Sequence, residues 1–301
     1  MAFPTNSHTS TTLADLIPEV WGDSINEFFK SKFVLADFFI DRSSEVSNGG
    51  DVLYTPTITE MSANSKAAGT AVTLNNPTET KITLSINQHY EVSYAIEDKE
   101  AAQVKHSYYV QERYAKNAGY TMAKKLEVAL ASLFSGFTGS VGASTAALAD
   151  SDIRSAIQKL EEANIDTSSD VAFFVSPGVF WSQIQALDKF ALAVNSPVND
   201  PTAKKPTALL YGIPVYVSTN IQYVSGTTGR YNAIAHKDAL HFATSPLGMG
   251  GSLGSSVTGA YNVRVQSNYI PEYLSTVTTA DLLYGVCENR DNAGVKIITS
   301  A

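Results

Sequence analysis

Apolar and polar residues alternate from Ile82 to Ile96, with Gln88 at one of the apolar positions, the pattern of a β-strand with one apolar face. At about 3.3 Å per residue such a strand would be about 50 Å long, well beyond the usual strand length. We therefore expect either one unusually long strand or a strand that bends midway.

Directly after it, apolar or small residues recur every three or four positions through residues 98–134, which predicts a helix of about 55 Å. Glu97 and Asp98 can cap its start, Gly119 is the expected point of a kink or a split, and Gly136 ends it. A very long strand that leads into a very long helix is typical of an elongated structural protein rather than of a compact enzyme domain.

Polar residues 59–81 separate the 82–96 strand from an earlier strand, in which Val52, Tyr54 and Ile58 share one face. Pro56 cannot donate to a ladder, so this earlier strand is expected at a sheet edge or with a bulge. Two strands that flank a long polar insert predict a hairpin arm that leaves the body of the protein.

The N-terminal residues predict a second arm. Residues 1–12 are polar, and a helix with an apolar stripe is expected from Pro18 to about Lys30. An apolar patch at 33–40 follows and leads into a turn at 47–50. The stripe must dock on its own domain or on a neighbouring subunit, and the sequence leaves both possibilities open.

Small residues 135–149 form the expected linker and domain boundary, because shorter elements on a modest sheet follow them. In chain order we expect a helix through Ile153, Ile157 and Leu160, a buried strand at Val171–Ser176, a helix from Pro177 to Leu187, a polar loop at 195–207, a strand at Gly212–Ser218, a tight hairpin turning at His236–Asp238, a Gly-rich loop at 248–254, long strands between 263 and 286, and a final strand at Val295–Ile298.

Composition narrows the functional classes. The 301 residues are 44% hydrophobic and carry a net charge of −8, which fits a globular protein without the basic face expected of a specific nucleic-acid binder. The single cysteine, Cys287, excludes an internal disulfide framework and a Cys-rich metal site. No apolar run is long enough to span a bilayer, and the first residues do not resemble a signal peptide.

The motifs that suggest chemistry do not assemble into a site. Gly250–Gly254 matches G-x-S-x-G around Ser252, but it is expected in a loop, and all five histidines precede it, so the hydrolase order fails. The same glycines miss the dinucleotide-binding spacing. His236 and His241 are expected at the surface of a turn and a strand, with no carboxylate set to complete a metal site. Tyr108, Tyr109 and Tyr114, at the start of the long helix, are interpreted as packing surface rather than as base-stacking residues.

Lys66, within the polar insert, is interpreted as an exposed loop lysine rather than as half of an isopeptide crosslink. No catalytic, cofactor-binding or metal-binding residue is therefore expected.

Six ordered segments are similar to those of one protein family: TLADLIPEVWGDSINEFF, GGDVLYTPTI, TLSINQHYEVSYAIEDKEAAQ, LLYGIPVYVSTNI, YNAIAHKDALHFA and VRVQSNYIPEYLSTVTTADLLYGVCENRDNAGVKI. They cover nearly the whole chain, and with them the chain resembles the major capsid proteins of tailed bacteriophages of the Hong Kong 97 type. The resemblance implies an α+β fold with these parts: an N-terminal arm at 1–50, an E-loop hairpin and its return strand at 51–96, the spine helix of the P-domain at 97–139, an A-domain at 140–262, return strands of the P-domain at 263–290 and a C-terminal strand at 291–301.

The resemblance also implies a function. Such a chain is a structural protein rather than an enzyme, and it self-assembles as hexamers and pentamers into an icosahedral shell around double-stranded DNA. The expected location is the virion capsid, assembled in the host bacterial cytoplasm. Expected partners are further copies of the chain, a portal, a separate scaffolding protein and decoration proteins, with non-specific contact to DNA and no membrane.

Three alternatives remain at this point. An encapsulin-type nanocompartment shell protein shares the fold. A soluble α/β enzyme using residues 150–260 is disfavoured by the missing catalytic set, and a surface adhesin by the missing export signal.

Overall fold

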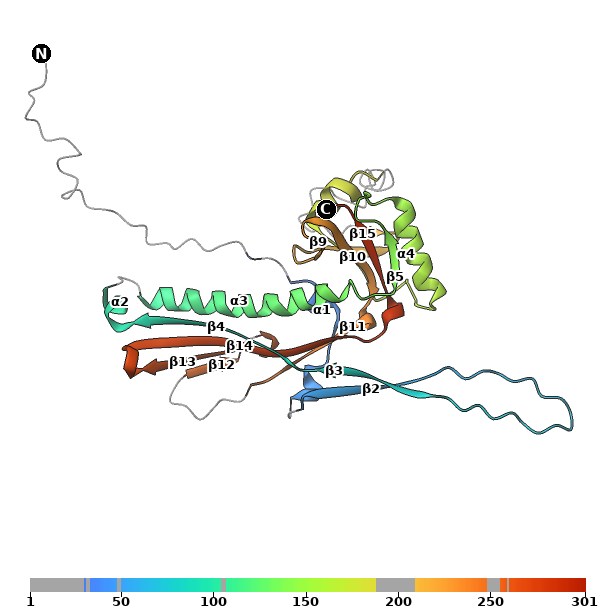
Figure 1. The fold of residues 1–301 in the computed structure, drawn as a ribbon, viewed down its shortest axis with the longest axis horizontal. Helices are drawn as coiled ribbons and strands as arrows, with labels where there is room; N and C mark the ends of the chain where they lie inside the picture. The colour runs from blue at the N-terminus through green and yellow to red at the C-terminus, as the bar shows by residue number, and fades with distance from the viewer. Residues whose placement is uncertain are drawn as a thin grey trace, which may run out of the picture. The chain divides into compact units, whose positions relative to one another are not determined.

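The computed structural model describes residues 30, 33–47, 50–103, 107–187, 209–247, 255–258 and 260–301, which form a mixed structure of helices and sheets (Figure 1). The expected α+β class is confirmed. The arm expected at 1–12, the helix expected from Pro18, the loop at 195–207 and the Gly-rich loop at 248–254 lie outside the described residues.

A long strand, β14 (Ser275–Glu288), organises a six-stranded sheet. It pairs antiparallel with three strands, β4, β11 and β13, and thereby uses both of its edges. The other strands of this sheet are β1 (Ile40–Asp41), β4 (Gln88–Glu97), β11 (Leu240–Ser245), β12 (Ser255–Thr258) and β13 (Arg264–Ile270).

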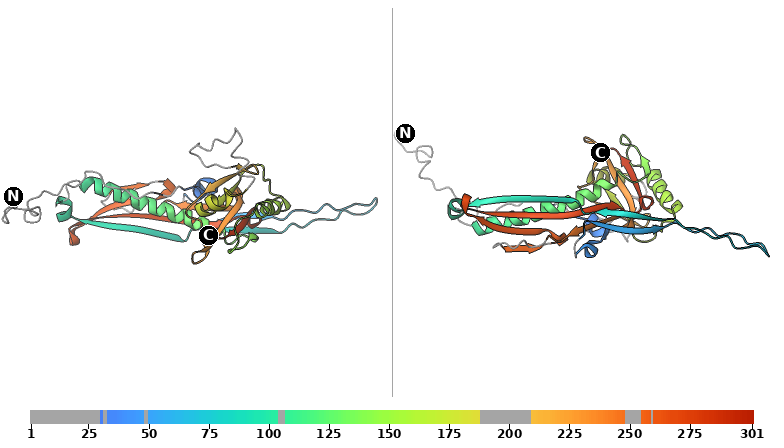
Figure 2. Two further views of the ribbon diagram at one scale, coloured as in Figure 1. Left: turned by 90° about the horizontal axis from the view of Figure 1, so that it is seen from above. Right: turned by 60° about the horizontal axis from the view of Figure 1, so that its bottom comes forward.

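The helix α3 (Ser107–Leu133) packs along β14 and β4, as two views of Figure 2 show. Its buried residues recur at helical spacing: Ala118, Met122, Leu126 and Leu130. The helix runs on through Gly119, so no split occurs there, and the Gly136 N–H donates to the Leu133 carbonyl 2.9 Å away after the last turn. The single helix expected at 98–134 is described as α2 (Asp98–Gln103) and α3, and residues 104–106 lie outside the described residues.

A second, seven-stranded sheet carries the helix α4 (Asp150–Glu162). The strand expected at 171–176 is confirmed as β6, all of whose residues are buried. Residues 139–142, expected in a linker, form β5, which pairs parallel with β15. The strands are β5 (Gly139–Gly142), β6 (Val171–Val175), β7 (Leu209–Leu210), β8 (Ile213–Val217), β9 (Tyr223–Ser225), β10 (Thr228–His236) and β15 (Gly294–Thr299). A short α5 (Pro177–Val179) and a π-helical turn (Phe180–Ile184) follow β6.

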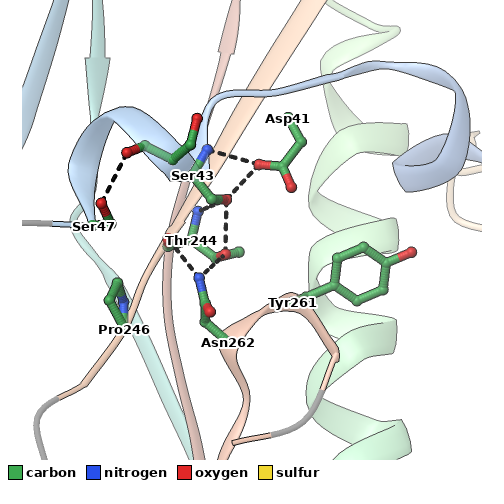
Figure 3. A pocket seen from close by; sticks show the side chains of 8 residues that line it. Asp41, Ser43, Ser47, Thr244, Pro246, Tyr261 and Asn262 are labelled. Carbon is green, nitrogen blue, oxygen red and sulfur yellow. Dashed lines mark hydrogen bonds between the residues drawn. The ribbon is translucent and has the colours of Figure 1, made fainter.

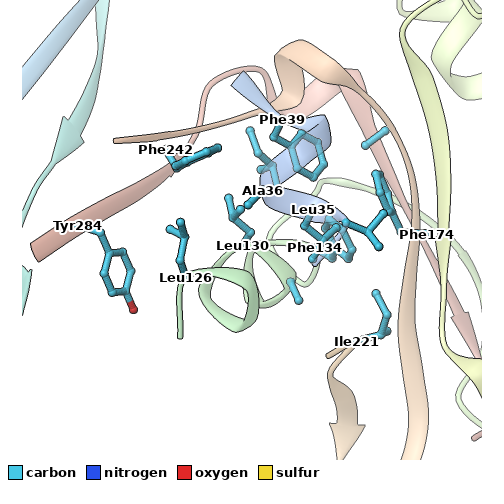
Figure 4. Close-up of a cluster of buried hydrophobic side chains, with 14 of the residues drawn as sticks. Leu35, Ala36, Phe39, Leu126, Leu130, Phe134, Phe174, Ile221, Phe242 and Tyr284 are labelled. Carbon is cyan, nitrogen blue, oxygen red and sulfur yellow. The ribbon is translucent and has the colours of Figure 1, made fainter. Parts of the chain in front are cut away.

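A buried apolar cluster joins the two sheets (Figure 4). Phe39 follows the short helix α1 (Leu35–Phe38), Phe134 follows α3, and Phe174 lies on β6. The ring centroids of Phe39 and Phe174 are 5.4 Å apart, and those of Phe134 and Phe174 are 5.7 Å apart. Aromatic pairs at such distances contribute about 0.5–1.5 kcal/mol beyond the burial of their area. The rings therefore fix the start of the described chain and the end of α3 against the second sheet.

The alternating run at 82–96 is two strands, which confirms the expectation of a strand that bends midway. The first, β3 (Glu79–Ser85), pairs with β2 (Val52–Ile58), whereas the second, β4, pairs with β14. At the break, the Ile86 N–H donates to the Asp51 carbonyl 2.7 Å away. Gly285 of β14 lies against this break, where a Cβ atom would overlap the Ser85 carbonyl oxygen. The hairpin strand crosses the sheet at a position that has no side chain.

The prediction of a tight hairpin at His236–Asp238 is wrong. A 3-10 turn (Lys237–Ala239) does follow β10, but β10 pairs with β6, β9 and β15, whereas β11 pairs with β1 and β14. Asn289 N–H donates to the Ala239 carbonyl at 2.8 Å, so the turn is held by the end of β14. Residues 237–239 therefore pass the chain from one sheet to the other.

Replacing Gly285 with alanine is expected to lower the free energy of unfolding by about 1–3 kcal/mol, because the new methyl group overlaps the backbone of β3. Denaturant unfolding of the full-length chain measures this change. Gly119→Ala is the control: its Cβ meets nothing within 4 Å, and helix propensity predicts a gain of up to about 1 kcal/mol. Equal stability of Gly285→Ala and the wild type would contradict this interpretation of the crossing.

Candidate assembly surface

The hairpin formed by β2 and β3 is the most exposed part of the described chain. Its register runs from Val52 opposite Ser85 to Ile58 opposite Glu79, and among the described strands these two pair only with each other. In Figure 1 the hairpin and its connecting residues, blue to cyan, extend beyond the strands that its base contacts. The edge position expected for the strand that holds Pro56 is confirmed.

Apolar side chains on this hairpin are open to solvent. Leu74 is 86% exposed, and four others on the strands and their connection are more than half exposed: Tyr54, Ile58, Met61 and Val72. The Tyr54 ring is partly covered by the Lys81 ammonium, which lies 4.1 Å from the ring centroid. Lys66, expected as an exposed loop lysine, is exposed. Apolar groups on a hairpin with no layer of the described residues behind them are suited to burial against another molecule.

The base of the hairpin is buried, in contrast to its outer part. Leu84 and Ile86 pack with Val46 and Ala243 in a small apolar cluster, and Leu53, Leu283 and Cys287 contact it. This cluster fixes where the hairpin starts.

The segment that leads to the hairpin is held by a buried carboxylate on α3. Glu127 Oε1 accepts from the backbone N–H groups of Val34 and Leu35 at 2.8 and 3.0 Å, and Oε2 accepts from Ala36 at 3.1 Å. The side chain is fully buried. Burial raises the pKa of Glu127, while the three backbone donors oppose that shift. Glu127 thus satisfies the N–H groups at the start of α1, whose N-cap residue, Val34, makes no side-chain cap hydrogen bond.

A second set of polar contacts ties the same segment to β11 (Figure 3). Ser43 Oγ accepts from the Thr244 N–H at 2.8 Å and lies 2.9 Å from Thr244 Oγ1, and Asn262 Nδ2 donates to Thr244 Oγ1 at 2.9 Å. Asp41 Oδ1 accepts from the Ser43 N–H at 2.8 Å. These residues line a pocket of about 460 Å³. Because their polar groups bond one another, the arrangement braces the segment.

The histidines do not gather into a site. His241, expected at the surface, is buried, because β11 lies between β1 and β14. His236 is half-buried and its Nδ1 accepts from the Asp238 N–H at 3.1 Å. His89 lies on β4, and its Nε2 atom is 3.3 Å from Asp281 Oδ2 of β14, the central strand of the six-stranded sheet. Arg264 lies on β13, which pairs with the opposite edge of β14. His8 and His106 lie outside the described residues.

Other candidate chemistry is equally dispersed. Ser252 lies outside the described residues, as does its G-x-S-x-G string. Burial raises the pKa of Cys287 to about 11, which keeps it a neutral thiol at neutral pH. Within the described ranges no three His, Cys, Asp or Glu side chains lie together as a metal site would need.

Tyr114 packs edge-on against Tyr94 of β4 with centroids 5.4 Å apart, in line with its interpretation as packing surface. The side chains of Tyr108 and Tyr109 lie outside the described residues. Among the helices of the described residues, none combines the length and the hydropathy of a membrane span.

Comparison with known proteins identifies the fold. No family model matches the sequence, and no curated protein does. Among solved structures, the chain is similar over 93% of its length to a structure from Mycobacterium phage Che8, with a TM-score of 0.71, 17% identity and 96% of that chain covered.

Two further structures show the same likeness. The capsid of cyanophage P-SCSP1u matches 99% of this chain and 96% of its own at a TM-score of 0.71 and 13% identity. The match to the mature capsid of bacteriophage PhiM1 covers 98% of this chain and 96% of that chain, with a TM-score of 0.70 and 12% sequence identity. The fold that the sequence resemblance implied, that of phage capsid proteins, is therefore confirmed.

Removing the Glu127 carboxylate is expected to destabilise the chain in proportion to the donors it leaves unpaired. Glu127→Ala should lower the free energy of unfolding by about 3–5 kcal/mol, and Glu127→Gln, which keeps one acceptor oxygen, by about 1–2 kcal/mol. Denaturant unfolding gives both values. Glu162→Gln, at an exposed site on α4, is the control, with an expected change below about 0.5 kcal/mol. An Ala variant as stable as this control would contradict the role given to Glu127.

Proposed function

We propose that this chain is the major capsid protein of a tailed bacteriophage, a structural protein that forms hexamers and pentamers of an icosahedral shell around double-stranded DNA. The observation that carries the proposal is the match of nearly the whole chain to phage capsid structures at TM-scores up to 0.71. The likeness extends over 93–99% of this chain and over 96% of each of these three structures.

The parts of the shell subunit are assigned on the same proposal. Residues 97–139 hold the spine helix, 51–96 the E-loop and its return strand, 140–262 the A-domain and 263–290 the return strands of the P-domain. The arm at 1–50 and the C-terminal strand at 291–301 complete the subunit. The strand pairing supports a change in these domain boundaries. Strand β11 belongs to the six-stranded sheet of β4 and β14, and β15 belongs to the seven-stranded sheet. The P-domain therefore includes residues 240–245, and the A-domain includes residues 294–299.

The hairpin supplies the physical reason for assembly. A two-stranded hairpin is at best marginally stable in water by itself, and this one leaves Ile58, Val72 and Leu74 more than half exposed. Burial of such apolar area is favourable by about 25 cal/mol per Å². A second copy of the chain supplies the missing layer when identical contacts repeat and close into a shell.

Partners other than further copies follow from the proposed role. A shell that fills with DNA needs a portal, and a separate scaffolding protein sets its curvature; decoration proteins are a further class of partner. The net charge of −8 fits non-specific contact with DNA, since tight phosphate binding would hinder packaging. The proposed location is the virion capsid, after assembly in the host cytoplasm.

Electron microscopy of the full-length chain, expressed alone and together with a candidate scaffolding protein, tests the proposal. Shells, sheets or rings of capsomers are expected, with uniform shells only in the presence of the scaffold. A chain that stays monomeric at high concentration under both conditions would overturn the proposal. Uniform shells that co-purify with a single enzyme would favour the encapsulin alternative.

Charging the hairpin is expected to block assembly without unfolding the subunit. Val72→Asp and Leu74→Asp place a carboxylate where apolar contact with a neighbour is proposed, whereas Leu74→Met keeps the site apolar and should assemble. Because these side chains are exposed, the free energy of unfolding should change by less than about 0.5 kcal/mol. Light scattering and denaturant unfolding separate the two effects, and normal shells from both Asp variants would contradict the role of the hairpin.

A further inference from the structure

Arg42 links the hairpin to the rest of the described chain through one guanidinium group. Its Nε and Nη2 atoms donate to the Glu45 carboxylate, in the 3-10 turn Ser43–Val46. Its Nη1 atom donates to Thr55 Oγ1 of β2 at 3.1 Å and lies 3.5 Å from His241 Nδ1 of β11. The same planar group therefore contacts the hairpin, the turn before it and the central sheet.

The partners of His241 define where its proton lies. Its Nε2 atom is 3.3 Å from Asp238 Oδ1, and its side chain is only 6% exposed. Arginine carries donors only and an ionised aspartate acceptors only. His241 Nδ1 must therefore accept from Arg42, and Nε2 must carry the hydrogen that faces Asp238. Both contacts are made at once only by the neutral imidazole with its hydrogen on Nε2.

The charges around His241 are already paired. Glu45 holds Arg42, and the Arg290 Nε atom lies 3.3 Å from the second oxygen of Asp238. Cys287, the cross-strand partner of His241 on β14, is a neutral thiol. Burial lowers the pKa of His241, and the Asp238 carboxylate opposes that shift. The neutral His241 therefore lies between Arg42 and Asp238, each of which is also paired with an oppositely charged side chain.

We propose that Arg42, His241 and Asp238 form a proton-operated clamp at the base of the hairpin. With His241 neutral, Arg42 is held against Thr55 and the hairpin keeps one angle to the sheet. A proton taken from solvent onto Nδ1 replaces the acceptor with a second donor and places a cation beside the guanidinium. Arg42 then leaves Thr55, and the hairpin base opens. The apolar base cluster of Leu84 and Ile86 keeps the hairpin attached in both states.

The direction of the pH effect follows from linkage. The released state holds His241 in contact with water, where its pKa is near the ordinary value of about 6.5. The clamped state binds the proton less well, so the released population grows as the pH falls below about 6.5. The clamp is present at neutral pH and is lost in acid. Each unit by which the released histidine is more basic than the clamped one raises the opening equilibrium by up to about tenfold.

Hydrogen exchange of the full-length chain tests the clamp, whether or not the chain builds a shell. The quantity measured is the protection factor of the β2 amides, corrected for intrinsic exchange rates, between pH 7.5 and 5.5, in one assembly state confirmed by light scattering. The amides of β6 report global unfolding. The wild type should lose protection in β2 as the pH falls while β6 stays protected.

Two histidine variants separate protonation from the loss of a contact. His241→Asn places its amide oxygen near the position of Nδ1, so Arg42 keeps an acceptor that does not titrate, and β2 should stay protected across the pH range. His241→Gln reaches toward Asp238 without an acceptor for Arg42, so protection should be low at every pH. Neither variant changes a residue of β2 or β3, but a two-stranded hairpin is marginally stable in water by itself, so its ladder opens more often once the clamp at its base is released.

Thr55→Val is the deciding variant if either histidine variant misfolds, because it removes the hairpin's contact and disturbs no buried charge. It should show low β2 protection at every pH. The clamp is overturned if Thr55→Val keeps the wild-type protection and pH dependence, or if His241→Asn loses protection in acid as the wild type does. A wild type whose β2 protection does not change with pH would overturn it as well.

Discussion

The packing of α3 against β14 is the contact on which the described part of the chain depends. β14 pairs with strands on both of its edges, and α3 covers one face of the sheet with fully buried side chains such as Leu126 and Leu130. Other parts attach to this pair. Residues 34–36 attach through Glu127 of the helix, and the hairpin crosses the sheet at Gly285 of the strand. A rigid pair of long elements gives each attachment a defined position.

The outer part of the hairpin follows the opposite rule, because no layer of the described chain covers either of its faces. Hydrophobic surface drives folding only when another surface covers it. In the sheets that surface lies within the same chain, whereas Ile58 and Leu74 have none among the described residues. One chain thus divides its apolar residues between a core that is complete and an arm that is not. On the proposed function, another copy of the chain completes the arm.

The sequence predicts the elements better than their partners. The run from Ile82 to Ile96 keeps one alternation although β3 and β4 pair with different strands, because each strand has one face more covered than the other. Glu127 gives no local signal either: an acid in a helix indicates a solvated face, and its three donors are 91–93 residues away in sequence. Whether His241 is exposed or buried depends on which strands lie beside β11, and the sequence does not give these strands. The pattern around residues 237–239 predicts a hairpin, although the chain passes there from one sheet to the other. Periodicity reports which faces are covered, and only the tertiary structure reports by what.

The contrast between apolar and polar contacts at the hairpin base explains why a clamp there is physically reasonable. Apolar contacts such as those of Leu84 and Ile86 are non-directional, so they keep the hairpin attached over a range of angles. Hydrogen bonds weaken steeply when their geometry changes, so the bond from Arg42 to Thr55 selects one angle. On the proposed function, an arm that meets neighbouring copies in a curved shell needs both properties, attachment that persists and an angle that can be released. The apolar cluster supplies the first, and a polar group whose acceptor is a titratable histidine supplies the second.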